Sequence, residues 1–112
     1  MQKRGLAANE LELEPLTGLF RLLSDKTRLN ILMLLTGGER NVTSLCEELG
    51  LPQPTVSHHL GLLRMSNVIT NRRNGKQVFY SLNGRVNMSK GMLNIGTDGF
   101  AVQIEQRQAA GA

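Results

Sequence analysis

The 112-residue sequence predicts a mainly α-helical domain that carries a small β-hairpin. Three observations support this prediction. Apolar residues recur at helical spacing over the first half of the chain, prolines and glycines divide that half into short helices, and Asn74-Gly75 separates two runs of β-prone residues. A chain of this length can bury one modest core, so we expect one small domain with short flanking segments.

The first helix is expected over residues 15–23. Pro15 suits a first helical position, and four apolar residues then follow at helical spacing, namely Leu16, Leu19, Phe20 and Leu23. The preceding residues 1–14 are predicted to form a mostly disordered arm, because they begin polar and small. Ser24 or Asp25 can cap the next helix. That helix has little polar surface before Gly37-Gly38 ends it, so we expect it at the centre of the core.

Two further short helices are expected around a tight turn. Asn41 or Thr43 can cap the segment TSLCEELG, and Gly50 ends it. After the turn LPQP, Pro54 fits the first turn of a fourth helix, where a missing backbone N–H costs nothing. Two short helices joined in this way form a helix-turn-helix.

The residues after Asn67 are predicted to form a hairpin. Residues 68–73 and 76–82 are β-prone and flank Asn74-Gly75, for which we expect positive φ at both turn positions. The order of helices and hairpin over residues 15–83 is that of a winged helix-turn-helix domain.

The C-terminal extension, residues 84–112, is expected to form a second hairpin. Its glycines make a long helix costly, at about 1 kcal/mol each relative to alanine. Apolar residues alternate with polar ones on both sides of residues 96–99, namely Leu93 and Ile95, then Phe100, Val102 and Ile104. A short helix near residues 86–90 is expected before this hairpin. We interpret the extension as a dimerisation segment.

The fourth helix is predicted to present a polar face over its first two turns. At about 100° per residue, Val56, Leu60 and Leu63 form a buried stripe, His58 lies opposite it, and His59 lies at its border. Four side chains near the helix N-terminus can hydrogen-bond to base edges or phosphates: Gln53, Thr55, Ser57 and His58. Donors and acceptors in this position suit readout of the DNA major groove.

The hairpin tip carries a cluster of cations, Arg72, Arg73 and Lys76, around Asn74. Such side chains can reach a phosphate or the minor groove. Alone, a charged tip is more often simply solvated. With a helix-turn-helix directly upstream, and with a formal net charge of +4 and a pI near 9.8, DNA is the favoured partner.

Metal binding and catalysis are not expected, so we predict no cofactor and no enzyme activity. His58 and His59 are the only histidines, and neighbouring helical side chains point about 100° apart, so they do not close easily on one ion. Cys46 is the only thiol and lies mid-helix among apolar residues, where a buried, inert cysteine is usual. A single cysteine and the absence of a span-length apolar run fit a cytoplasmic protein with no membrane partner.

Three stretches, LFRLLSDKTRLNILMLL, VTSLCEELGLPQPTVSHHLGLLRMSNVI and TNRRNGKQVFYSLN, resemble the ArsR/SmtB family of winged-helix repressors over about residues 16–83. The resemblance implies a homodimer that binds an inverted-repeat operator and represses transcription until an inducer arrives. It assigns recognition-helix contacts to Gln53, Thr55, Ser57 and His58, with His59 as the family's common His before Leu. The wing contacts would be Arg72, Arg73, Asn74 and Lys76.

The chain departs from the family at its sensing sites. Arsenic- and cadmium-type members have paired cysteines where Cys46 stands alone here, and the C-terminal segment has no histidine for a zinc or nickel site. Oxidant sensors pair two cysteines in one chain, and this chain has one. We therefore expect operator binding to be insensitive to these metals, with control by protein level, an organic ligand or another protein.

The sequence leaves two points open. The same fold can act as a protein-interaction module without specific DNA binding, although the basic tip and the polar helical face favour DNA. The subunit interface is expected to use the first helix and the segment after Asn83. Both carry surplus apolar residues, namely Leu11, Leu13, Leu16 and Leu19, then Phe100, Val102 and Ile104.

Overall fold

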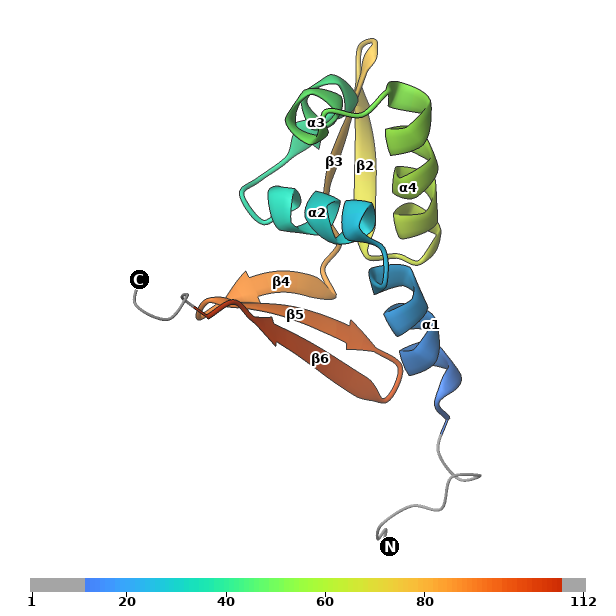
Figure 1. Ribbon diagram of the computed structural model, residues 1–112, viewed down its shortest axis with the longest axis vertical. Helices are drawn as coiled ribbons and strands as arrows, with labels where there is room; N and C mark the ends of the chain where they lie inside the picture. The colour runs from blue at the N-terminus through green and yellow to red at the C-terminus, as the bar shows by residue number, and fades with distance from the viewer. Residues whose placement is uncertain (1–11, 108–112) are drawn as a thin grey trace, which may run out of the picture.

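The computed structural model describes residues 12–107 as four helices and two small antiparallel sheets (Figure 1). Residues 1–11 of the expected N-terminal arm lie outside the described residues. The elements follow one another in the order α1 (Glu14–Leu23), α2 (Lys26–Leu35), β1 (Arg40–Asn41), α3 (Val42–Leu49), α4 (Gln53–Met65), β2 (Ile69–Asn74), β3 (Gln77–Leu82), β4 (Val86–Ser89), β5 (Met92–Thr97) and β6 (Phe100–Glu105).

Side-chain caps begin α2 and α3 at residues named as candidates from the sequence. The Asp25 carboxylate accepts a hydrogen bond of 3.0 Å from the Arg28 backbone N–H, and the Asn41 side-chain oxygen accepts one of 2.8 Å from the Ser44 N–H. Asp25 rather than Ser24, and Asn41 rather than Thr43, therefore provide the caps. Gly50 ends α3 in the left-handed conformation with a φ of 67°, which glycine adopts without steric cost.

Helix α4 begins at Gln53, with two prolines at its entrance as expected, and ends through a left-handed residue. Asn67 has a φ of 62°, and the N–H of Val68 donates a 3.2 Å hydrogen bond to the Leu63 carbonyl. Helices α3 and α4 are thus two short helices joined by a tight turn, which confirms the helix-turn-helix.

The predicted wing is present as the antiparallel pair β2–β3, but its turn is shifted by one residue. Asn74 pairs with Gln77 as the last residue of β2, so Gly75 and Lys76 occupy the turn. The expectation of positive φ at both Asn74 and Gly75 was wrong, because only Gly75 has it, at 65°. The two-residue strand β1 was not predicted; it pairs with β3 and joins the α2–α3 connection to the wing.

The C-terminal segment forms a three-stranded sheet in the order β4-β5-β6. The hairpin β5–β6 was predicted, whereas the short helix expected near residues 86–90 was wrong, because β4 is a strand paired with β5. Val86 pairs with Ile95 and Met88 with Leu93, so alternate side chains of β4 join the apolar face of the sheet. This pairing buries Val86, which a helix in isolation would not achieve.

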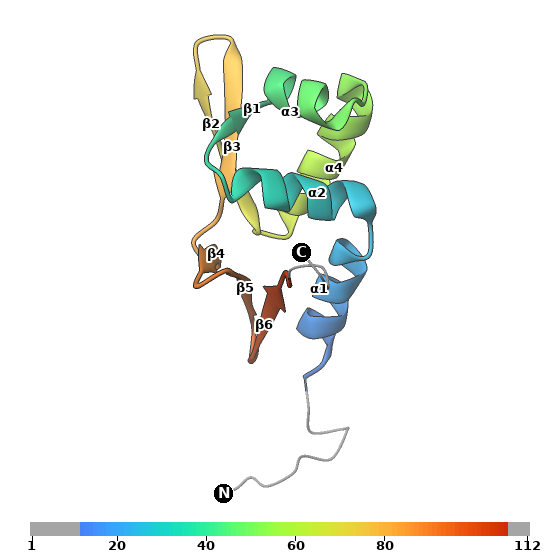
Figure 2. The ribbon, with the colours of Figure 1, turned by 60° about the vertical axis from the view of Figure 1, so that its left-hand side comes forward.

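Helix α2 lies at the centre of the core, as predicted. Its residues Ile31, Leu32 and Leu35 are buried, and α2 packs against α1, α3, α4 and β3. The predicted α4 stripe of Val56, Leu60 and Leu63 belongs to the same core. Figures 1 and 2 show the sheet β4-β5-β6 at the end of the molecule opposite the tip of the hairpin β2–β3. Within the described residues, no helix has the length and apolar character that crossing a membrane requires.

Candidate nucleic-acid interface

The N-terminal half of α4 presents the polar face that the sequence predicts. Gln53, Thr55, Ser57 and His58 are all exposed, while Val56 between them is fully buried. The buried stripe fixes the helix on α2 and α3, so these four side chains are held on a rigid surface. Figure 1 shows that this end of α4 and the tip of the hairpin β2–β3 lie at the same end of the molecule.

His59 is half-buried and faces α2 rather than the exposed face of α4. The Nη1 atom of Arg28 lies 3.2 Å from His59 Nδ1, and the Asp25 carboxylate lies 3.9 Å from the same nitrogen. Arg28 also donates a 2.6 Å hydrogen bond to the carbonyl of Leu22 in the last turn of α1. His59 thus belongs to a polar cluster that ties α4 to α1 and α2. The backbone N–H of Arg28, together with the nearby charges of His59 and Arg28, lowers the pKa of Asp25.

The two histidines of α4 contact each other through their rings. Their ring centroids are 5.4 Å apart in an edge-on arrangement, so His58 packs beside the anchored ring of His59. Within residues 12–107, no three side chains of the His, Cys, Asp and Glu types come together in a way that could hold a metal ion. Cys46 is partly buried and packs against the core.

The wing cations differ in their surroundings. Arg73, Asn74 and Lys76 are exposed, and neither Arg73 nor Lys76 forms an ion pair with any described residue. Arg72 instead donates two hydrogen bonds of 2.8 Å to the Glu39 carboxylate, and its guanidinium lies 4.8 Å from the centroid of the Phe79 ring. These hydrogen bonds lower the pKa of Glu39 and raise that of Arg72. Arg72 therefore fastens the wing to the segment before β1.

We expect replacement of Glu39 by glutamine to remove a pH-dependent part of the stability. Because the pKa of Glu39 is lower in the folded state, its contribution is present above the ordinary value of 4.5 and is lost as pH falls through the folded-state pKa. In urea unfolding, Glu39→Gln should lower the midpoint at neutral pH and match the wild type well below pH 4.5. Glu47→Gln, at an exposed carboxylate without an ion pair among the described residues, is the control. An equal difference at both pH values would contradict the ion pair.

A polar cleft of about 270 Å³ lies between the N-terminus of α4 and the wing. Its lining comes from the N-termini of α3 and α4 and from the wing, namely Asn41, Val42, Thr43, Gln53, Lys76, Gln77 and Val78. The side chain of Asn41 donates a 3.4 Å hydrogen bond to the Gln77 side chain across it. The sequence analysis named Asn41 and Thr43 only as capping candidates, and Gln77 only as part of a β-prone run. The free N–H groups at the start of α3 make this cleft suitable for a negatively charged group.

Comparison with known proteins identifies the protein family to which this chain belongs. Residues 25–71, which contain α2, α3 and α4, match the model of the bacterial regulatory proteins of the arsR family. The transcriptional repressor SdpR of Bacillus subtilis is 38% identical over 71 residues, covering 63% of this chain and 79% of SdpR. This chain belongs to the ArsR family.

Two further comparisons support the assignment. The arsenical resistance operon repressor of Escherichia coli is 45% identical over 69 residues, which are 61% of this chain and 59% of that repressor. Among solved structures, reduced HlyU from Vibrio cholerae superposes with a TM-score of 0.65 at 30% identity, covering 70% of this chain and 83% of HlyU. The fold is therefore a winged helix-turn-helix, and the ArsR-family chain is a DNA-binding transcriptional regulator, not an enzyme.

Proposed function

We propose that this ArsR-family chain is a repressor that binds an inverted-repeat operator in double-stranded DNA as a homodimer. The observation that carries the proposal is the exposed polar face of α4, formed by Gln53, Thr55, Ser57 and His58, at the same end of the molecule as the wing tip. Each subunit inserts the first two turns of α4 into the major groove, where these side chains reach base edges. A cytoplasmic location follows from this role and stays a prediction.

The wing and the cleft beside it hold the DNA backbone. Arg73 and Lys76 are exposed cations without intramolecular partners among the described residues, so they are available to phosphates. A backbone phosphate seated in the cleft would meet Lys76, the side chain of Gln53 and the first N–H groups of α3. Arg72 keeps the wing at the correct distance through Glu39, and His59 keeps α4 in place through Arg28.

The subunit interface is formed by the outer face of α1 and the free end of the sheet β4-β5-β6. Leu13, Leu16 and Phe20 form a stripe along one side of α1, with Leu13 38% and Phe20 51% exposed. Met88 and Ile104 are 43% and 38% exposed on the apolar face of the sheet. Of the other residues that the sequence places here, Leu11 lies outside the described residues and Leu19 is buried within the subunit. A second copy can cover these apolar surfaces through a self-complementary contact.

The alternative role as a protein-interaction module has less support. The exposed residues on the first two turns of α4 include no acidic and no large apolar side chain. A docking surface for another protein would be expected to carry aromatic or other large apolar anchors. DNA therefore remains the favoured partner of this face.

The experiment that tests the reading face is replacement of His58 by alanine. His58 is exposed opposite the buried stripe, so its loss should relax discrimination at one base position per half-site by about 1–3 kcal/mol. Affinities for the operator and for a set of operators with single base-pair changes would be measured by fluorescence anisotropy. Binding to unrelated DNA, with its salt dependence, is the internal control and should be unchanged. Undiminished discrimination by His58→Ala would show that another face reads the DNA.

A further inference from the structure

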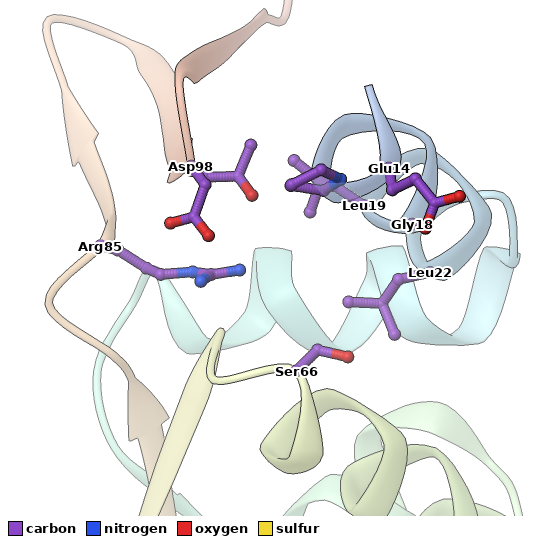
Figure 3. Close-up of a pocket in the computed structure, with 9 residues that line it drawn as sticks. Glu14, Gly18, Leu19, Leu22, Ser66, Arg85 and Asp98 are labelled. Atoms are coloured by element: carbon purple, nitrogen blue, oxygen red, sulfur yellow. The ribbon is translucent and has the colours of Figure 1, made fainter. Parts of the chain in front are cut away.

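A second cleft, of about 300 Å³, lies at the end of the molecule away from the wing. It is bounded by α1, by the residue that ends α4, and by the β3–β4 and β5–β6 connections (Figure 3). One wall is apolar, with Pro15, Leu19 and Leu22 of α1, and the other is polar, with Ser66, Arg85 and Asp98. A volume of this size is at the lower end of the range of about 300–1,000 Å³ for small-molecule sites.

Arg85 is the feature of this cleft that needs explanation. Its Nε atom is buried and has no hydrogen-bond partner among the described residues. Figure 3 shows its guanidinium extending beneath Asp98 toward the α1 wall, yet no ion pair within 4.0 Å joins the two charged groups in the part of the chain that the structure describes. The buried Nε has almost no exposed surface, so an acceptor bound in the cleft would meet the Nη groups of the guanidinium, which lines the cleft and has no hydrogen-bond partner among the described residues.

We propose that the cleft binds a small amino carboxylate, a zwitterion with a short apolar side chain. The ligand carboxylate accepts from Arg85, its ammonium group faces Asp98, and its side chain packs on Leu19 and Leu22. A simple anion would be repelled by Asp98, and a simple cation would be repelled by the guanidinium of Arg85. A ligand that carries both charges meets both requirements.

The position of the cleft couples its occupant to DNA binding, a step that rests on the proposed function. At about 100° per residue, the α1 residues that line the cleft lie roughly opposite the stripe of Leu13, Leu16 and Phe20 assigned to the subunit interface. Ser66 in the cleft is the C-cap of α4. An occupant therefore contacts both α1, which is assigned to the subunit interface, and the end of α4, which is assigned to the DNA. It will change operator affinity if the relative position of these two helices differs between the free and DNA-bound states.

Calorimetric titration with three probes tests the ligand class. L-Leucine carries both charges, 4-methylpentanoate lacks the ammonium group, and 3-methylbutylamine lacks the carboxylate. The wild type should bind leucine saturably and each analogue at least about tenfold more weakly, because each analogue loses a charge-assisted hydrogen bond. No binding of leucine, or equal binding of 4-methylpentanoate, would overturn the proposal.

Matched variants locate the site. Arg85→Gln and Asp98→Asn should each weaken leucine binding by about tenfold or more, whereas Arg107→Gln, at an exposed arginine after β6, should bind as the wild type does. Asp98 is exposed in a turn, so Asp98→Asn is informative even if Arg85→Gln were to destabilise the fold. Leucine binding unaffected by either change would overturn the assignment of these residues.

The effect on DNA is measured separately, by adding leucine to the protein bound to a duplex from the promoter of its own gene. Operator affinity should change by about fivefold or more in the wild type and not at all in Arg85→Gln. If leucine bound but operator affinity stayed unchanged, the proposed effect of the ligand on DNA binding would be overturned, and the ligand site itself would stand. If the ligand-free protein did not bind the duplex, the proposed function would be contradicted. The proposal of an amino carboxylate site would then be judged by the calorimetric titration alone.

Discussion

Replacing Leu13 and Phe20 together by aspartate is expected to convert the dimer into monomers and to lower operator affinity by more than about 100-fold. Both side chains are exposed on α1, so the subunit fold should tolerate the change. In the dimer, the two carboxylates per subunit would be buried without partners, at a cost that an apolar interface cannot offset. A monomer would retain one reading helix, which contacts too few base pairs for specific binding.

Sedimentation velocity measures the oligomeric state of the variant, and a binding titration measures its operator affinity. The control is Asn30→Asp with Thr70→Asp, which adds the same two carboxylates at exposed polar positions on α2 and β2, outside the residues assigned to the interface. The control protein should remain dimeric. If Leu13→Asp with Phe20→Asp sediments as a dimer, the interface does not use the outer face of α1.

The second large effect is expected from Arg73→Ala combined with Lys76→Ala. Neither cation has an ion-pair partner among the described residues, so both are available to phosphates. Their loss should weaken operator and unrelated DNA alike by more than about tenfold. The slope of log K against log salt should become shallower by about one for each lost contact, or about four for a dimer.

Two control variants test whether the effect on DNA binding comes from Arg73 and Lys76 in particular. Arg72→Ala should change the salt slope less than Arg73→Ala, because the guanidinium of Arg72 is already bonded to Glu39. Lys90→Gln with Arg107→Gln removes two exposed cations from the β4–β5 connection and the segment after β6, outside the wing and α4, and should leave DNA binding unchanged. An unaltered salt slope for Arg73→Ala with Lys76→Ala would mean that the wing tip does not contact the backbone.

The helix-turn-helix could be predicted from sequence because local signals agree with the tertiary fold there. The buried stripe of α4 follows from the 3.6-residue period, and Gly50 and the prolines mark the turn. The exposed face opposite that stripe follows from the same period, so Gln53, Thr55, Ser57 and His58 lie where they were expected.

The partners of Arg72 and His59 could not be predicted, because both come from distant parts of the chain. Glu39 precedes Arg72 by 33 residues and is brought to it by the pairing of β1 with β3. Arg28 precedes His59 by 31 residues and reaches it through the packing of α2 on α4. A periodic pattern of apolar residues indicates local structure and does not predict contacts between distant residues. The sequence analysis therefore assigned both residues to DNA binding without identifying their intramolecular partners.

The errors in β4 and in the wing turn have similar causes. The sequence of residues 86–90 has no strong local preference, and its conformation is decided by pairing with β5. In the wing, Asn74-Gly75 correctly marked the position of a hairpin. The register that pairs Asn74 with Gln77, however, moves Asn74 into the strand and Lys76 into the turn. The cleft at Arg85 likewise depends on the unpredicted arrangement of the sheet beside α1.

The central claim is that the chain reads DNA sequence through α4 as a dimer, and one measurement tests it most directly. Fluorescence anisotropy would compare binding of the wild type to a duplex from the promoter of its own gene and to a scrambled duplex of equal composition, across a range of salt concentrations. We predict that the promoter duplex binds more tightly by about 10³-fold or more at physiological salt, with affinity for both duplexes falling steeply as salt rises. Equal affinity for the two duplexes at every salt concentration would contradict the account.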